Sequence, residues 1–189
     1  MPTPEISQQL DTSELVQLLQ QSAVEHLTEF RQLEAQEFGS VHRIATTDFE
    51  ALYAYKRGEY QRCLQLSIDS VKLLIDDEGL SCLFVYPEFI QLMDDNIVSL
   101  TGLALIVNPS CRNQPNVFAN ALSQLTLSLY LMTQCQLKLH HSMASLAQTV
   151  GYISLARQQH NEDFTLGQLL LKLIERQILT CVSAELLVM

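Results

Sequence analysis

Residues that interrupt helices are scarce in this chain of 189 residues, which contains only six Gly and five Pro. Between them, apolar side chains recur at steps of three and four positions, the spacing that places them on one face of an α-helix. Leu and Gln are frequent and β-branched residues are few, a composition that favours helices over strands. The sequence therefore predicts an all-α protein of about seven helices.

Local signals divide the chain into these helices. Thr47 and Glu50 have the spacing of a capping box, which predicts a helix start at Thr47. Gly58 lies between two segments with apolar residues at helical spacing. After a long N-terminal helix within residues 1–40, helices are expected at residues 47–57, 60–76, 87–107, 116–140, 142–159 and 165–185.

Short turns between consecutive helices predict antiparallel hairpins. A helical hairpin cannot bury its apolar face alone, so such hairpins stack on their neighbours. The expected architecture is a single domain over residues 1–189. In it, the N-terminal helix is followed by a hairpin at 47–76 and by further hairpins over 87–189.

The segment Leu125–Leu131 is ambiguous, because its four leucines alternate with polar and aromatic residues as they do in a strand. A longer window favours a helix, since apolar residues from Phe118 to Leu139 also fit a helical stripe. Thr126 is the only β-branched residue between positions 119 and 131. A helix is therefore the prediction here.

Ionic residues are distributed unevenly along the chain. Residues 1–95 contain six Lys or Arg and seventeen Asp or Glu, whereas residues 96–189 contain five and four. The acidic half repels phosphate groups and the other half has only scattered cations, so a nucleic-acid partner is not expected. Residues 113–137 lack charge, but eleven of them are Asn, Gln, Ser or Thr, too polar for a lipid-facing helix. No membrane partner is expected either.

Cysteine usage indicates a reducing compartment. The number of cysteines is odd, their spacing is irregular and no CxxC pair occurs; they are Cys63, Cys82, Cys111, Cys135 and Cys181. The N-terminal segment has no cationic stretch followed by an apolar run, so no secretory signal is visible. The prediction is a cytoplasmic protein with reduced thiols.

No pattern of residues indicates catalysis or metal binding. The Gly58-Glu59-Tyr60 turn has no Lys-Ser/Thr after its glycine and so does not match a phosphate loop. No cysteine has the local signature of a nucleophile. Cys135 lies five and six residues from His140 and His141, which does not place the three side chains on one helical face. We therefore expect no enzyme activity, no metal and no cofactor.

The corner around Gly58 resembles a tetratricopeptide repeat, a helix–turn–helix unit. The resembling residues are Ala51 in the first helix, Gly58 and Tyr60 at the turn, and Cys63 in the second helix. Small residues at 51 and 63 allow close approach of the two helices, and the glycine permits the sharp corner. One repeat is recognisable, at about residues 47–76. The later hairpins, beginning at residues 87 and 142, are spaced less regularly than the family's repeats.

The resemblance implies a non-catalytic scaffold or adaptor that binds a protein or peptide partner in a groove lined by the first helices. The groove residues it implies are Asp48, Leu52, Tyr55 and Lys56. Leu52 and Tyr55 fit the interior of stacked helices equally well, and that alternative is open at this level.

The alternative function is a helical-bundle oligomerisation or assembly domain of a larger protein. Only three residues between positions 96 and 160 are ionic, namely Arg112, Lys138 and Arg157. Helices with so few charges are typical either of a surface covered by a second copy, as in a homodimer, or of inner helices within one stack.

Overall fold

The computed structural model describes residues 40–76, 95–107, 122–159 and 165–186, and a few positions between 14 and 25. Its helices are α2 (Ser40–Lys56), α3 (Tyr60–Asp76), α4 (Asp95–Val107), α5 (Gln124–Lys138), α6 (Met143–Gln159) and α7 (Thr165–Leu186). Every element longer than one residue in these ranges is a helix, which confirms the all-α prediction. Most of the expected N-terminal helix lies outside the described residues.

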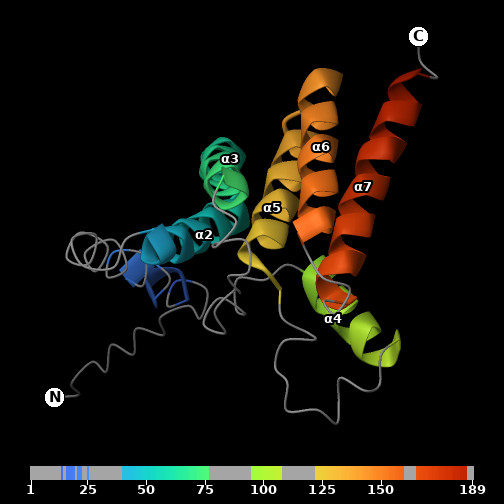
Figure 1. Cartoon of the computed structure of the whole chain (residues 1–189). Coiled ribbons are helices and arrows are strands. Elements are labelled where there is room, and N and C mark those ends of the chain that lie inside the picture. The colour runs from blue at the N-terminus through green and yellow to red at the C-terminus, as the bar shows by residue number, and fades with distance from the viewer. Residues whose placement is uncertain are drawn as a thin grey trace, which may run out of the picture.

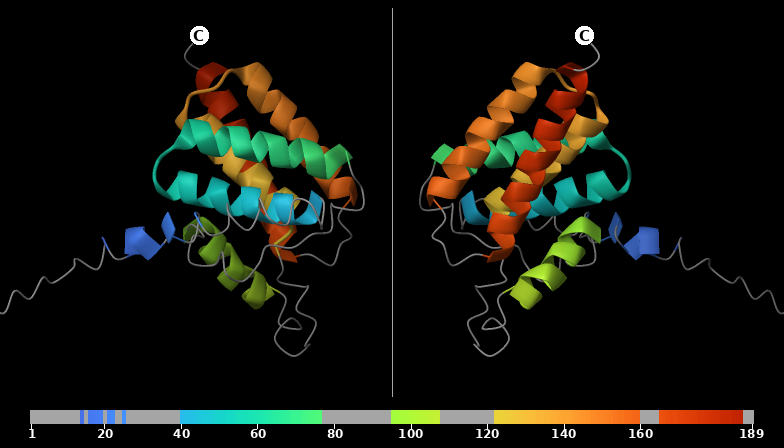
Figure 2. Two further views of the ribbon diagram at one scale, coloured as in Figure 1. Left: turned by 90° about the vertical axis from the view of Figure 1, so that its left-hand side faces the viewer. Right: turned by 90° about the vertical axis from the view of Figure 1, so that its right-hand side faces the viewer.

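The helices are arranged in layers around α5. Figure 1 shows α5 between the α2–α3 pair on one side and α6 and α7 on the other. Helices α2 and α3 run side by side and cross the direction of α5, whereas α6 and α7 lie along its opposite face (Figure 2). Helix α4 packs against α7 at the lower end of the stack.

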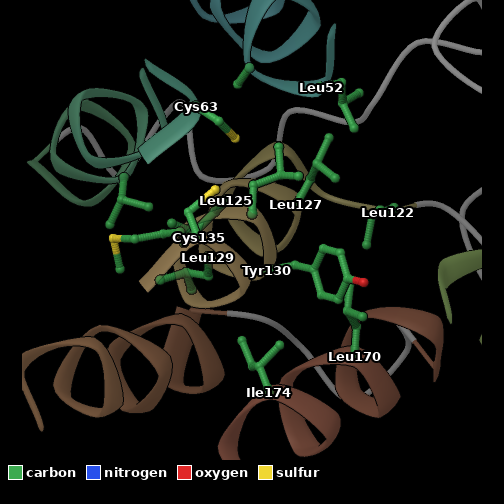
Figure 3. Packing of buried hydrophobic residues seen from close by; sticks show 14 of the residues in the cluster. Leu52, Cys63, Leu122, Leu125, Leu127, Leu129, Tyr130, Cys135, Leu170 and Ile174 are labelled. Carbon is green, nitrogen blue, oxygen red and sulfur yellow. The ribbon is translucent and has the colours of Figure 1, made fainter. Parts of the chain in front are cut away.

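Helix α5 is enclosed on all sides. Every side chain from Gln124 to Gln136 is buried, and α5 packs against α2, α3, α6 and α7. Leu125, Leu127 and Leu129 leave the helix axis in different directions (Figure 3), and all four leucines of Leu125–Leu131 are 0% exposed. Their strand-like alternation therefore reflects a helix with no solvent face, and the prediction of a helix here is confirmed.

The corner between α2 and α3 is a Schellman motif. The Gly58 amide donates to the Tyr55 carbonyl at 3.0 Å, and the Glu59 amide donates to the Ala54 carbonyl at 2.9 Å. Gly58 has φ +76°, a left-handed conformation that glycine adopts without steric cost. The sequence prediction of a tight helical corner at Gly58 agrees with this geometry.

The other corner residues pack as the hairpin requires. Ala51 and Cys63 are 1% and 0% exposed, so small side chains lie in the interior on both helices. The Tyr60 ring contacts Tyr55 edge to face, with 5.8 Å between the ring centroids. That contact links the last turn of α2 to the first turn of α3.

A second Schellman motif ends α5, with a histidine in the glycine position. The His140 amide donates to the Leu137 carbonyl at 3.4 Å, and the His141 amide donates to the Gln136 carbonyl at 3.0 Å. His140 has φ +52°, where a Cβ atom is strained against the backbone.

These two corners predict opposite effects of a glycine–side-chain exchange. Gly58→Ala should lower the free energy of unfolding by about 1 kcal/mol, because nothing lies within 4 Å of the added Cβ and the cost is backbone strain alone. His140→Gly should raise it by about 0.5–1 kcal/mol, since it relieves the same strain. Urea titration of both variants measures the two changes. If both substitutions changed the free energy of unfolding in the same direction, the left-handed conformations of Gly58 and His140 would be contradicted.

Several helix boundaries differ from the sequence prediction. Helix α2 begins at Ser40 rather than at Thr47, because residues 40–46 contain no Gly or Pro and the capping pattern at Thr47 falls inside the helix, where Thr47 is buried. Helix α5 begins at Gln124, where the Ser123 Oγ accepts a hydrogen bond from the Thr126 amide at 3.2 Å. The residues expected to begin the fourth and fifth helices, 87–94 and 116–121, lie outside the described ranges.

Candidate functional site

Two of the four expected groove residues are interior. Asp48 is 1% exposed and Leu52 is 0% exposed, because α5 packs over the face of α2 that carries them. Figure 3 shows Leu52 next to Leu127 of α5. Asp48 and Leu52 therefore do not line an open groove, and for Leu52 the alternative of an interior position is the one observed.

The other two expected groove residues lie near the end of α2. Tyr55 is half-buried against Tyr60, and Lys56 is exposed. Lys56 is thus the single member of the expected set with an exposed side chain.

The two arginines beside the corner are held by neighbouring acids. The Arg57 guanidinium contacts the Glu59 carboxylate at 3.1 Å and donates from Nη1 to the Tyr53 hydroxyl at 3.1 Å. Arg62 lies 3.6 Å from Glu59 and 3.9 Å from Glu50. Their charge is therefore balanced locally, and these two arginines do not form a basic patch at this corner.

Asp48 is an acid buried among hydroxyl groups. The Ser128 hydroxyl of α5 donates to Asp48 Oδ1 at 3.0 Å, and Ser70 of α3 also faces this carboxyl. Burial raises the pKa of Asp48 from 3.8 to about 8, although the hydroxyls of Ser128 and Ser70 partly oppose the rise. Asp48 Oδ2 and Ser70 Oγ are buried and neither has a hydrogen-bond partner. A proton on Oδ2 that is shared with Ser70 satisfies both atoms, so we assign Asp48 as neutral in the folded protein at pH 7.

Uncharged polar side chains join α5 to its other neighbours. Gln136 donates to the Ser145 hydroxyl at 3.0 Å and accepts from the Thr149 hydroxyl at 2.8 Å, both in α6. Gln134 donates to the Gln177 side chain of α7 at 2.6 Å. These pairs explain why α5 is rich in Gln, Ser and Thr and carries no charge before Lys138, because most of these groups are satisfied inside the stack. The exception is Gln124 Oε1, which is buried without a hydrogen-bond partner.

Helix α4 also contacts α5 through a polar pair. Asn96 Nδ2 donates to the Tyr130 hydroxyl at 3.1 Å, and Ile97 is 3% exposed. These two residues, with the packing of α4 on α7, hold one face of α4 against the stack.

The side of α4 that faces away from the buried Ile97 presents apolar side chains to solvent. Val98, Leu103 and Ile106 are 57%, 43% and 71% exposed. Gly102 lies one helical turn from both Val98 and Ile106, and a Cβ placed on it would meet nothing within 4 Å. We call Val98, Gly102, Leu103 and Ile106 the α4 face. The apolar run Ile97–Val107 was visible in the sequence, but its exposure was not.

No cluster of metal ligands is found among the described residues, where at no point do three His, Cys, Asp or Glu side chains come together. Cys63 and Cys135 are buried free thiols and Cys181 is partly buried, whereas Cys82 and Cys111 lie outside the described residues. None of the helices that the structure describes is long and apolar enough to cross a bilayer.

Comparison with known proteins gives no relative: no family model matches the chain, and no similar curated protein or solved structure is found. Function is therefore inferred from the geometry of this chain alone.

Proposed function

We propose that the protein is a non-catalytic, TPR-like interaction module that binds another protein through the α4 face. The observation that carries this proposal is the exposure of three large apolar side chains on one side of a helix whose other side is fixed to the stack. Large apolar side chains that are exposed together on one helix are typical of protein-binding sites.

The chemistry of the α4 face selects the class of partner. Its four residues carry no charge and no side-chain hydrogen-bonding group, so a phosphate or another small charged ligand gains nothing there. An apolar ridge on a partner helix fits, because Gly102 leaves room for close approach between Val98 and Ile106.

The α2–α3 corner supports the TPR-like part of the proposal. The resemblance rests on Ala51, Gly58, Tyr60 and Cys63. In the structure Gly58 occupies the left-handed position of the Schellman turn, Ala51 and Cys63 are interior, and the Tyr60 ring packs against Tyr55. In this chain, α5 covers the face of α2 that would otherwise be available as a groove, so the proposed partner surface is on α4 instead.

A second copy of the chain is the alternative occupant, as in a homodimer or an assembly domain. The low charge of residues 96–189 favours it, since two copies that meet through this half avoid the repulsion between their acidic halves. The uncharged residues of α5 do not add support, because the same chain already covers them.

The proposal predicts that a charge on the α4 face weakens partner binding. The test variant is Ile106→Asp. Its matched control is Leu179→Asp on α7, because Leu179 is 56% exposed but lies outside the α4 face. With the full chain as bait and quantitative mass spectrometry as readout, Ile106→Asp should lose a partner at least about tenfold, since it removes one buried apolar side chain from the interface.

A photo-crosslinking residue at Leu103 should attach to the same partner that Ile106→Asp loses. Melting temperatures within a degree or two of wild type show that both variants stay folded. If Ile106→Asp captured the same proteins as wild type, or if Leu179→Asp lost them to the same extent as Ile106→Asp, binding through the α4 face would be contradicted.

A further inference from the structure

We propose that Cys63 and Cys135 form a reversible disulfide that links α3 to α5 when the protein is exposed to peroxide. The two thiols belong to facing helices, and their sulfur atoms point toward each other in the interior (Figure 3). Both residues are 0% exposed, so neither sulfur has a solvent-side alternative partner in this arrangement.

Small side chains allow close approach of α3 and α5 along this contact. Helix α3 presents Cys63, Ser67 and Ser70 to the interior, and each is buried. On α5, Ser128 and Cys135 are seven residues apart, the same separation as Ser70 and Cys63. Asp48 joins the two serines at one end, and each cysteine lies two helical turns away from its serine, on helices that run in opposite senses as they cross.

The two thiols have different roles in the oxidation. A hydrogen bond from the Cys135 thiol lowers the pKa of Cys63, opposing the effect of burial, and the Ser67 hydroxyl 3.9 Å from Cys63 Sγ acts in the same direction. The same interaction and burial raise the pKa of Cys135. Cys63 is therefore the nucleophile and Cys135 the resolving thiol.

The reaction is a two-electron oxidation by one peroxide molecule. Cys63 sulfur attacks a peroxide oxygen and breaks the O–O bond, which gives a sulfenic acid and water. Cys135 sulfur then attacks the sulfenic sulfur, breaks its S–O bond and releases a second water with the thiol proton. The two sulfurs lose two electrons, and the peroxide gains them.

Burial restricts which oxidant can reach the pair. Hydrogen peroxide is comparable in size to water, whereas glutathione disulfide is a large peptide that cannot reach a sulfur atom with no exposed surface. The pair is therefore selective for small peroxides while the protein stays folded.

The test uses the full chain with Cys82→Ser, Cys111→Ser and Cys181→Ser, which leaves only the pair. Hydrogen peroxide should lower the intact mass by about 2 Da, dithiothreitol should restore it, and a protease digest should recover the peptides of Cys63 and Cys135 joined. The melting temperature should rise by roughly 5–15 °C, because the bond closes a loop of roughly 70 residues. Glutathione disulfide over the same time should leave the mass unchanged.

Two further variants and the wild-type chain keep the test decisive. Cys63→Ser and Cys135→Ser in the same background should each abolish the 2 Da loss. If the triple variant does not fold, a protease digest of the oxidised wild-type chain detects the same joined peptides of Cys63 and Cys135. Gain of one or two oxygen atoms without a cross-link, a cross-link that forms only in denaturant, or a lower melting temperature after cross-linking would overturn the proposal.

Discussion

Replacement of Asp48 by asparagine is expected to stabilise the protein at pH 7 and to remove most of its loss of stability toward alkaline pH. The folded-state pKa of Asp48 is about 8, against an ordinary value of 3.8. Between these values the folded protein keeps a proton that the unfolded chain has released. The free energy of unfolding therefore falls as pH rises, by about 1.4 kcal/mol per pH unit, and levels off above pH 8.

The total effect of this one group is on the order of 5 kcal/mol, a large part of the stability of an ordinary domain. An asparagine at this position would mimic the neutral acid, since its amide oxygen can accept from Ser128 and its NH₂ can donate to Ser70. Asp48→Asn should thus approach the stability of the protonated wild-type protein at every pH above 4, with a gain that grows until about pH 8.

Urea titrations of both proteins from pH 5 to pH 9 measure this difference directly. The control is Asp69→Asn, an exposed position on α3 that should leave the curve close to wild type because its side chain stays hydrated. Parallel curves for wild type and Asp48→Asn, or a variant that is less stable throughout, would show that Asp48 is not a buried neutral acid.

Truncation of each leucine in Leu125–Leu131 is the second large expected effect. All four are 0% exposed. Their alanine variants should each lower the free energy of unfolding by about 2–5 kcal/mol, because each removes packed side-chain atoms and leaves a cavity. In an amphipathic helix, positions two apart turn by about 200° around the axis, so one or more of the four would face solvent and cost little.

The matched control is Leu155→Ala on α6, where the leucine is 42% exposed. It should cost less than about 1 kcal/mol, since most of the removed surface is already in contact with water and alanine favours the helix. Chemical denaturation of the five variants tests the enclosure of α5. A small effect at two alternate leucines would indicate that part of α5 faces solvent.

The local features of the fold could be predicted from the sequence. Gly58 supplies a left-handed residue between two apolar-striped segments, and that information lies within a few positions. Helices α3, α6 and α7 have boundaries within one residue of those expected from breakers and periodicity. The capping pattern at Thr47 gave the wrong start for α2. Residues 40–46 can also be helical, and the packing of the helix outweighs a local capping signal.

What depends on long-range packing could not be predicted. The enclosure of α5 requires α2, α3, α6 and α7 together, and no window of sequence contains all five helices. Asp48 was expected on a groove because the resemblance to a tetratricopeptide repeat implied it, and its burial is possible because Ser128, eighty residues away, faces it. The exposure of the α4 face likewise depends on which side of α4 meets α7, which an apolar run alone does not specify.

Hydrogen–deuterium exchange at two protein concentrations tests most directly the claim that α5 is enclosed by its own chain while the α4 face is left open for a partner. Amides of α5 should exchange slowest of the described helices, with equal protection at about 1 μM and at about 100 μM, and those of α4 should exchange faster at both concentrations. If α5 exchanged as fast as α4, or were protected only at the higher concentration, α5 would not be enclosed by its own chain.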